Sequence, residues 1–201
     1  MTMRLGILGG TFDPVHNGHL LLAERCREEC RLDRVAFLPA GIPPHKLTQS
    51  ITDVNSRAEM LSLAIVGRPE FVVDRRELKR TEPCFTVETL AELREEDPHR
   101  ELVFLMGADS LADFPKWKAP GRILELAEIA VVNRGGAPTP DLSPLIEQFG
   151  ASATGRVQIV TIPGIEIASR DIRERARLGK SIRYLVPRAV ECYIAEHRLY
   201  R

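Results

Sequence analysis

Short, mostly apolar segments alternate with segments of helical periodicity along the chain. An apolar run of a few residues bounded by polar or turn residues is typical of a strand that is buried on both faces. The candidate strands are Arg4–Leu8, Arg34–Leu38, Phe71–Asp74, Glu101–Met106, Ile129–Asn133 and Val157–Ile162. The expected helices lie between and after them, at about residues 18–30, 55–66, 86–96, 109–113, 120–127, 141–149, 169–178 and 187–197.

This alternation of strand and helix predicts an α/β fold of the Rossmann-like, doubly wound kind, with a mostly parallel sheet and helices on both faces. The chain has 201 residues, which is enough for one such domain with its own core. We expect a single domain over residues 1–201 that ends in a small helical part at about 169–201. In open parallel sheets, ligands bind at the carboxyl ends of the strands, so the residues after the first strand are a candidate site.

The residues after the first strand combine glycines with two histidines, in the order Gly9-Gly10-Thr11-Phe12-Asp13-Pro14-Val15-His16-Asn17-Gly18-His19. His16 and His19 are three positions apart at a helix start, so they share one face of its first turn. The start of the helix offers unpaired N–H groups and a positive partial charge, and the glycines allow a ligand to approach the backbone. Together these features predict a binding site for nucleotide phosphates.

Charge and cysteine content restrict the class of protein. Lysine and arginine number 28, as do aspartate and glutamate, so the chain is no polycation of the kind that binds nucleic acid. No apolar run is long enough for a membrane span and no signal-peptide pattern begins the chain, so we expect a cytoplasmic protein without a membrane partner. We expect Cys26, Cys30, Cys84 and Cys192 to be reduced core thiols, with a metal or redox pair at Cys26 and Cys30 as the alternative.

The common phosphate-binding motifs are not matched. Residues Gly6–Gly10 have the wrong spacing for G-x-G-x-x-G, which disfavours a nicotinamide dehydrogenase. Gly179-Lys180-Ser181 resembles the end of a P-loop, but Glu174 occupies the position of the required first glycine. A zinc site at the two histidines is also disfavoured, because no cysteine or carboxylate completes the ligand set at a usual spacing.

The glycine and histidine motif resembles that of the nucleotidyltransferase α/β-phosphodiesterase superfamily. Six further segments, in the same order as in the family, are similar to bacterial nicotinate-nucleotide adenylyltransferases. They are Leu38–Lys46, Asn55–Met60, Phe85–Leu90, Gly107–Leu111, Phe114–Trp117 and Ser181–Pro187. The resemblance therefore covers the chain from the first strand to the last helix.

The resemblance implies a reaction in NAD biosynthesis that joins ATP to nicotinate mononucleotide, giving nicotinate adenine dinucleotide and pyrophosphate. The attacking group would be the substrate's own phosphate, which is already mostly dianionic at neutral pH because its second pKa is about 6. We therefore expect direct in-line transfer that needs no general base. Mg²⁺ would enter with ATP and keep mostly phosphate and water ligands, since no carboxylate cage is evident.

The resemblance also assigns residues to the site. Catalysis is expected from His16, His19, Lys46 and Arg173. ATP is expected to contact Gly9, Gly10, Thr11, Phe12, His16, Gly18, His19, Gly107, Asp109, Ser169 and Arg173. The nicotinate nucleotide is expected to contact Thr11, His45, Lys46, Thr86, Trp117 and Arg134. No residue is assigned to a protein-held metal.

Several roles within this set are specific. His19 would donate to the α-phosphate in the transition state, and Lys46 would supply a counter-charge from a loop that two prolines stiffen. Trp117 would stack on the pyridinium ring, and N–H groups near Thr86 would hold its carboxylate. Asp109 would accept hydrogen bonds from the ribose of ATP.

Arg173 belongs to a second segment, Ile167–Arg173, that is similar to the family's second ATP motif. Arg173 would reach the β- and γ-phosphates, and Ser169 would cap the helix. The sequence departs from the family pattern at Ala168 and Arg170, where serine and threonine are usual.

Other interpretations stay open at this point. The two histidines, Arg173, Asp109 and Trp117 each have a purely structural alternative, as caps, core residues or a solvated arginine. Another adenylyltransferase of the superfamily, such as a phosphopantetheine adenylyltransferase, would share the first motif, and a non-catalytic nucleotide sensor would tolerate the changes at 168 and 170. The sequence leaves homo-oligomerisation open, and we expect Val190, Ile194 and Leu199 in the last helices to serve packing alone.

Overall fold

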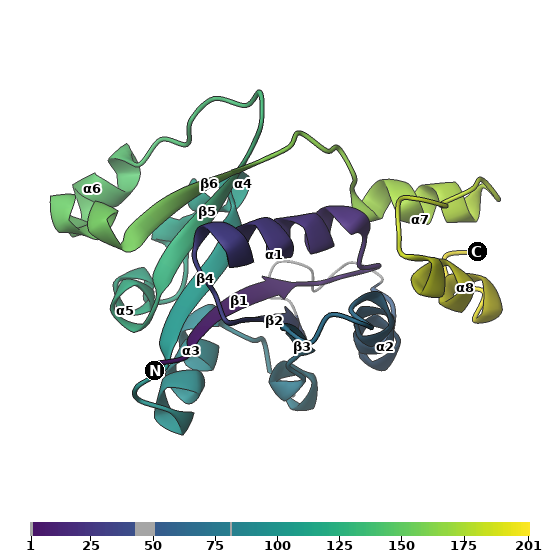
Figure 1. The fold of residues 1–201 in the computed structure, drawn as a ribbon, viewed down its shortest axis with the longest axis horizontal. Coiled ribbons are helices and arrows are strands. Elements are labelled where there is room, and N and C mark those ends of the chain that lie inside the picture. Colours follow the sequence, from purple (N-terminus) through teal and green to yellow (C-terminus); the bar gives the residue numbers. More distant parts are fainter. Residues whose placement is uncertain (1, 43–50, 81) are drawn as a thin grey trace.

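A computed structural model describes residues 2–42, 51–80 and 82–201. Its centre is a six-stranded parallel sheet in the order β3-β2-β1-β4-β5-β6 (Figure 1). The strands are β1 (Arg4–Gly10), β2 (Arg34–Pro39), β3 (Phe71–Val73), β4 (Glu101–Gly107), β5 (Glu128–Arg134) and β6 (Val157–Ile162). The order reverses at β1, which pairs with β2 on one side and with β4 on the other. A switch of this kind leaves a crevice at the carboxyl ends of β1 and β4.

Helices cover both faces of the sheet because alternate residues of each strand point to opposite sides. On one face, Leu8, Phe37 and Leu105 pack in a buried cluster with α1 (Asn17–Glu29) and α2 (Val54–Ala64). The opposite face has its own cluster around Ile7 and Phe104. The helices of that cluster are α3 (Thr86–Glu96), α4 (Ala108–Leu111), α5 (Pro120–Leu126) and α6 (Ser143–Phe149). The predicted doubly wound α/β architecture is confirmed.

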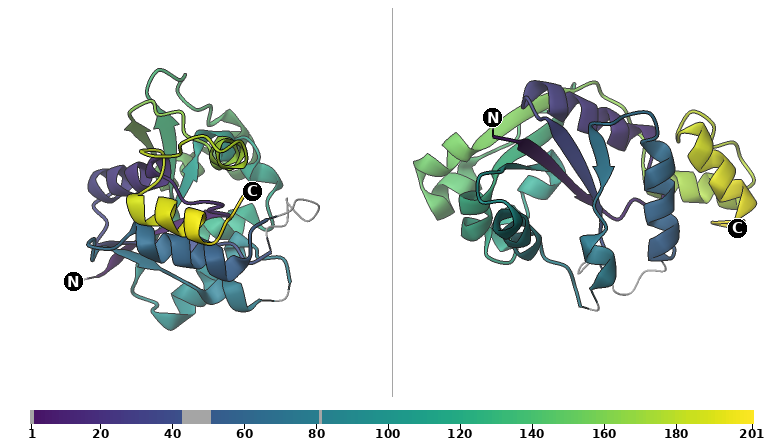
Figure 2. Two further views of the ribbon diagram at one scale, coloured as in Figure 1. Left: turned by 90° about the vertical axis from the view of Figure 1, so that its right-hand side faces the viewer. Right: turned by 60° about the horizontal axis from the view of Figure 1, so that its bottom comes forward.

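The last two helices, α7 (Ser169–Arg177) and α8 (Arg188–Glu196), lie beyond the carboxyl ends of the strands (Figure 1). Figure 2 shows α8 running beside α2, and the two helices are in contact. Val190 and Ile194 are buried in the cluster that contains α1 and α2, as the packing role expected for them requires. The C-terminal segment is therefore tied to the part of the sheet that carries the candidate site.

Each strand and helix expected from the sequence pattern occurs where it is predicted, with ends that differ by at most two residues. Strand β1 continues to Gly10, and α6 begins at Ser143 instead of residue 141. The short 3-10 helices η1 (Arg76–Lys79), η2 (Phe114–Lys116) and η3 (Ala151–Arg156) were not anticipated. They are one or two turns long, too short to show an apolar period. Within the described residues, no helix is both long and apolar enough to cross a membrane.

The expectation that all four cysteines are core thiols is wrong for one of them. Cys26, Cys30 and Cys84 are buried, but Cys192 is exposed on α8. All four are free, and burial raises the pKa of Cys26 to about 12. Cys192 follows the buried Val190 by two positions, and two positions on a helix place it on the opposite side.

Candidate active site

A large cavity opens at the carboxyl ends of β1, β4, β5 and β6, on the side where α7 begins. Its volume is about 1600 Å³. It is lined by most of the residues predicted to bind ATP, namely Gly9, His16, Gly18, His19, Gly107, Asp109 and Ser169. Arg134, which was predicted to contact the nicotinate nucleotide, lines this same cavity from the end of β5.

A second cavity of about 330 Å³ lies on the other side of β1. The residues predicted for the nicotinate nucleotide that line it are Thr11, Thr86 and Trp117. Gly9, Phe104, Ser110 and Trp117 line both cavities. The two cavities therefore meet at the end of β1, where a glycine leaves room for two ligands to approach each other.

His16 and His19 form a stacked pair at the start of α1. His16 is the residue before the helix, and its backbone N–H donates to Nδ1 of His19 at 3.2 Å. The ring centroids are 3.7 Å apart and the planes differ by 22°. Because Nδ1 of His19 accepts a hydrogen bond, the ring proton of a neutral His19 resides on Nε2, which is then a donor.

Both histidines are held neutral. Burial, together with the neighbouring His16 ring, keeps the pKa of His19 well below its usual value. Burial and the positive charge of Arg134 lower the pKa of His16 to about 4. A neutral imidazole can still donate one hydrogen bond, so the pair can offer N–H groups to an anion without carrying charge itself.

The loop between β1 and α1 is fixed by side chains from distant segments. Arg57 on α2 is only 2% exposed, and its guanidinium donates to the carbonyls of Thr11 at 2.7 Å and Ala40 at 2.9 Å. Its Nε donates to the carbonyl of Thr52 at 3.0 Å. Since Thr11 and Ala40 line the smaller cavity, this buried cation sets the distance between two of its walls.

Arg57 has no role in the sequence-based site. One signal for it was available: Arg57 precedes Met60 and Leu61 by three and four positions, so it shares their apolar face of α2. An arginine on a buried helix face must have acceptors, and main-chain carbonyls of the site loops supply them here.

The residues predicted from the second ATP motif lie close to the loop between β1 and α1. Arg173 donates to the carbonyl of Asp13 at 2.7 Å, and Ser169 Oγ donates to the carbonyl of Pro14 at 2.9 Å. The expected capping role of Ser169 is wrong: the N-cap is Ala168, and Ser169 is the first residue of α7. Its hydroxyl is used instead to attach α7 to the β1–α1 loop.

Some residues predicted for the site are not found among the described residues that line either cavity. Phe12 is buried beneath the site, with its ring 5.0 Å from that of His19, and is not among the described residues that line either cavity. Arg173 is likewise outside both linings in the described part of the chain. His45 and Lys46 lie outside the described residues, so their roles stay predictions.

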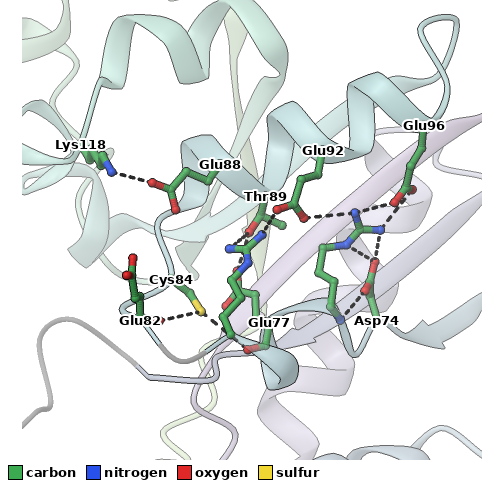
Figure 3. Close-up of polar contacts among 11 residues, drawn as sticks. Asp74, Glu77, Glu82, Cys84, Glu88, Thr89, Glu92, Glu96 and Lys118 are labelled. Atoms are coloured by element: carbon green, nitrogen blue, oxygen red, sulfur yellow. Dashed lines mark hydrogen bonds and ion pairs between the residues drawn. The ribbon is translucent and has the colours of Figure 1, made fainter.

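Figure 3 shows a polar network that joins η1 to α3, and some of its residues line the smaller cavity. Glu77 is 5% exposed and accepts a hydrogen bond from Thr89 Oγ1 at 2.7 Å, and both line the cavity. Arg80 donates to the same Thr89 oxygen at 3.0 Å and pairs with Glu92 at 2.6 Å. Burial raises the pKa of Glu77. This network, which the sequence did not indicate, fixes η1 against α3, whose first residue is Thr86.

Trp117 is held between aromatic rings. Its centroid lies 5.9 Å from that of Phe104 and 5.6 Å from that of Phe114. Half-buried in this way, the indole keeps a fixed orientation at the boundary of the two cavities, where a planar ring can stack on it.

No group of three or more histidine, cysteine, aspartate or glutamate side chains in residues 2–42, 51–80 and 82–201 could hold a metal ion. Asp109, Asp141 and Glu166 line the large cavity without forming such a group.

The doubly wound parallel sheet, the histidine-bearing loop and the large cavity belong to a nucleotidyltransferase, as a family match and several relatives show. A family model described as cytidylyltransferase-like matches residues 7–175. Curated relatives narrow the class, and the chain belongs to the nicotinate-nucleotide adenylyltransferase family. The relative from Thermomicrobium roseum, named "Probable nicotinate-nucleotide adenylyltransferase", is 51% identical over 198 residues, covering 98% of this chain and 92% of the relative.

A relative of the same name from Thermus thermophilus is 42% identical over 200 residues, with 99% of this chain and 100% of the relative covered. Among solved structures, the nicotinic acid mononucleotide adenylyltransferase of Plasmodium falciparum superimposes with a TM-score of 0.79 over 98% of this chain and 97% of that chain. Its sequence is 18% identical, so this likeness concerns the fold. That protein is described in complexes with APC and with NaAD.

Proposed function

We propose that this chain transfers the AMP group of ATP to nicotinate mononucleotide, in a single in-line displacement in which His19 stabilises the transferring phosphate. The observation that carries this proposal is the pair of cavities that meet at Gly9. One cavity has room for a nucleoside triphosphate, and the other has a size and lining suited to a planar ring and its sugar. The description of the Plasmodium relative with NaAD, the product of such a transfer, supports the same assignment.

In the proposed reaction, an oxygen of the nicotinate mononucleotide phosphate attacks the α-phosphorus of ATP. A new P–O bond forms while the bond between the α-phosphorus and the bridging oxygen breaks, and pyrophosphate leaves with the electron pair. The nucleophile is a dianion at neutral pH, so no proton has to be removed. This agrees with two neutral histidines that are depressed in pKa and unsuited to act as charged acids near pH 7.

The protein's contribution is then alignment and hydrogen bonding. Holding two reactants in line is worth roughly 7–11 kcal/mol. Each donor aimed at the charge that develops in the transition state adds roughly 10²–10³ in rate. Nε2–H of His19 is such a donor, and its direction is fixed because Nδ1 is bonded to the backbone of His16. We assign His16 the same kind of contact with a neighbouring phosphate oxygen.

The ring of the nicotinate would lie in the smaller cavity between Trp117 and the first residues of α3. Trp117 offers an electron-rich face to a pyridinium cation. N–H groups at the start of α3, near Thr86, suit the carboxylate of the ring. Asp109 is exposed at the edge of the large cavity and is placed to accept from the ribose of ATP.

Mg²⁺ is proposed to bind with ATP, held mainly by phosphate oxygens and water, and to neutralise charge on the pyrophosphate that leaves. Lys46 and Arg173 are the proposed protein cations for that group. Arg173 would have to exchange its contact with the carbonyl of Asp13 for a phosphate oxygen. The proposed location is the cytoplasm.

The test is a comparison of acceptors. Pyrophosphate release is measured with ATP, Mg²⁺ and either nicotinate mononucleotide, nicotinamide mononucleotide or phosphopantetheine. We expect kcat/KM to be highest for nicotinate mononucleotide. A higher kcat/KM for phosphopantetheine would contradict the proposal. So would ATP binding with no pyrophosphate released in the presence of any of the three acceptors.

A further inference from the structure

The phenol of Tyr200, which follows the last helix, reaches the loop between β1 and α1. Its hydroxyl donates to Oδ1 of Asp13 at 2.7 Å, although the two residues are 187 positions apart. We propose that Tyr200 is a positioning residue of the active site, which acts through Asp13 to hold the Thr11–Pro14 loop in its reactive conformation. This inference rests on the function proposed above, because it assigns the loop's geometry to adenylyl transfer.

Three distant segments of the chain contact Asp13, which lies in the loop between β1 and α1. It is 4% exposed, and its second carboxylate oxygen accepts the backbone N–H of Thr52 at 3.2 Å. Its main-chain carbonyl accepts from Arg173 at 2.7 Å. The guanidinium of Arg57 lies near enough to interact electrostatically with both Asp13 and Tyr200. A buried carboxylate needs such partners, and Tyr200 supplies a direct one from the C-terminal segment.

The loop that Asp13 anchors connects directly to the reacting groups. Thr11 lines the smaller cavity, and Phe12 packs its ring against His19. Asp13 is followed three positions later by His16, whose backbone N–H orients His19. A shift of Asp13 is therefore transmitted to a wall of one cavity and to the proposed phosphate donor in the other.

The backbone on both sides of the contact is in an uncommon conformation. Phe12 has φ of 51°, next to Asp13, and on the other side Arg198 has φ of 51° and Tyr200 has φ of 65°. The left-handed region is disfavoured for side chains of this size, and persists where surrounding contacts fix it. The hydrogen bond between Tyr200 and Asp13 joins these two segments, each of which contains residues in the left-handed conformation.

The hydroxyl stays a donor over the whole range of assay pH. Burial and the neighbouring Asp13 carboxylate raise the pKa of Tyr200. The proton is thus retained, and the carboxylate keeps its partner.

The test uses the full chain and removes one hydroxyl. Tyr200→Phe keeps the ring that packs against the core cluster and deletes the donor. The matched control is Tyr193→Phe: Tyr193 is also half-buried and packs on the same cluster, but its ring stacks on His197, 3.9 Å away. For each protein, kcat, KM for ATP, KM for nicotinate mononucleotide and Tm are measured.

We expect Tyr200→Phe to lower kcat at least about tenfold, because a displacement of about 1 Å at a reacting group can cost 10² in rate. The KM values should change less than about threefold, since neither Tyr200 nor Asp13 is among the described residues that line the two cavities. Tyr193→Phe should keep the wild-type kcat. A kcat for Tyr200→Phe within twofold of the wild type, or an equal loss in both variants, overturns the inference.

A double-mutant cycle tests whether Tyr200 acts through Asp13. Asp13→Ala combined with Tyr200→Phe should be no slower than Asp13→Ala alone, within about twofold. Multiplied losses would show that the hydroxyl acts elsewhere. If Asp13→Ala does not fold, the comparison of the two tyrosine variants still decides the question.

A second measurement separates this inference from the proposed function. Amide hydrogen exchange of the peptide covering residues 9–16 should be faster in Tyr200→Phe than in the wild type or Tyr193→Phe. If the wild-type chain transfers AMP to no acceptor, the proposed function fails, and the exchange experiment alone decides whether Tyr200 holds the loop. Unchanged exchange in Tyr200→Phe would overturn the inference in either case.

Discussion

The backbone N–H of His16 donates to Nδ1 of His19, and this single bond decides which nitrogen of a neutral His19 carries the ring proton and can donate. The neighbouring ring of His16 stacks on the same imidazole. The pair thus combines a fixed tautomer with a fixed ring plane. In the proposed reaction, which needs no general base, such orientation is the main contribution that a neutral histidine can make.

Replacement of His19 by alanine should therefore lower kcat by at least about 10², the cost of one lost transition-state donor. The fold should stay intact, because the helix keeps its other contacts. Steady-state kinetics with ATP and nicotinate mononucleotide, together with a circular dichroism melt, measure both effects. His99→Ala, at an exposed position, serves as the control. A rate close to the wild type in His19→Ala would refute the role proposed for it.

The depressed histidine pKa values predict a loss of stability in acid. The unfolded chain binds a proton on His16 near pH 6.5, whereas the folded chain does so only near pH 4. The unfolded state therefore holds more protons between these values, and the free energy of unfolding falls as the pH falls from about 6.5 to about 4. Above pH 6.5 the contribution of His16 to the free energy of unfolding no longer changes with pH. The total loss on acidification to pH 4 is about 3 kcal/mol, the free energy that corresponds to a pKa shift of this size.

Urea denaturation at pH 7.5, 6.0 and 5.0 measures that dependence. His16→Gln should show a weaker loss of stability over this range than the wild type. His99→Gln should follow the wild-type curve, because the ring of His99 is exposed. Parallel curves for the wild type and His16→Gln would contradict the assignment.

Substitution of two glycines of β1 should distinguish an effect on activity from an effect on stability. A Cβ at Gly9 would have only Phe104 in ordinary contact, at 3.9 Å, but would enter the boundary of the two cavities. A Cβ at Gly6 would lie 2.5 Å from Leu32 Cδ1, inside the core. Gly9→Ala should keep the wild-type Tm and lose at least about tenfold in kcat/KM, because two ligands must meet at that point.

Gly6→Ala should show the opposite result, with a lower Tm and a kcat near the wild type. The free energy of unfolding should fall by about 1–3 kcal/mol in Gly6→Ala, as is common when a core is overpacked. Thermal melts and kinetics on the two purified variants give the comparison. Full activity in Gly9→Ala would show that the ligands do not meet at β1.

Trp117 provides a direct signal for ring binding, because it is the only tryptophan of the chain. Nicotinate mononucleotide should quench its fluorescence, since a pyridinium ring stacked on the indole is electron-poor. Titration without ATP measures the affinity. Trp117→Phe should raise KM for nicotinate mononucleotide by about tenfold, with a smaller effect on KM for ATP. Failure of the mononucleotide to alter the emission would place the ring elsewhere.

Arg57→Lys tests the buried cation beneath the loop. A lysine cannot serve the carbonyls of Thr11, Ala40 and Thr52 together, since it lacks the planar fork of donors. We expect a loss of about 2–4 kcal/mol in the free energy of unfolding, measured by urea denaturation, from unpaired carbonyls and a buried charge. Arg122→Lys, on α5, should change it by less than about 0.5 kcal/mol.

The sequence predicted the α/β architecture well because its elements are strongly patterned: Leu5–Leu8 and Leu102–Met106 are continuous buried runs, and each is followed by a helix. The proximity of His16 and His19 was predicted from their spacing at the helix start, although His16 is the N-cap and lies outside the helix. The supporting residues did not follow, because their roles depend on which segments are adjacent in space. The contacts of Asp13 with Tyr200 and of Arg57 with Thr11 join positions that no local pattern connects.

The same limit applies at single residues. Ser169 fits a cap by its type, but it is the first residue of α7, and its hydroxyl donates to the carbonyl of Pro14, which only the folded chain brings near. Arg173 was assigned by resemblance to a phosphate contact, which stays a prediction, and in the structure its guanidinium donates to the carbonyl of Asp13. Glu77 and Thr89 form a wall of the smaller cavity through a hydrogen bond between η1 and α3, and spacing along the chain does not reveal such a pair.

The position of β1 between β2 and β4 has a kinetic consequence during synthesis. Its partner β4 begins at Glu101, 97 residues after Arg4 at the start of β1. At about 5–20 residues per second, one edge of β1 stays without its neighbour for about 5–20 seconds on the ribosome. An unpaired apolar strand is prone to association with other chains during that interval. The central position of β1, whose carboxyl end lines both cavities, thus also means that the pairing of this strand is completed late.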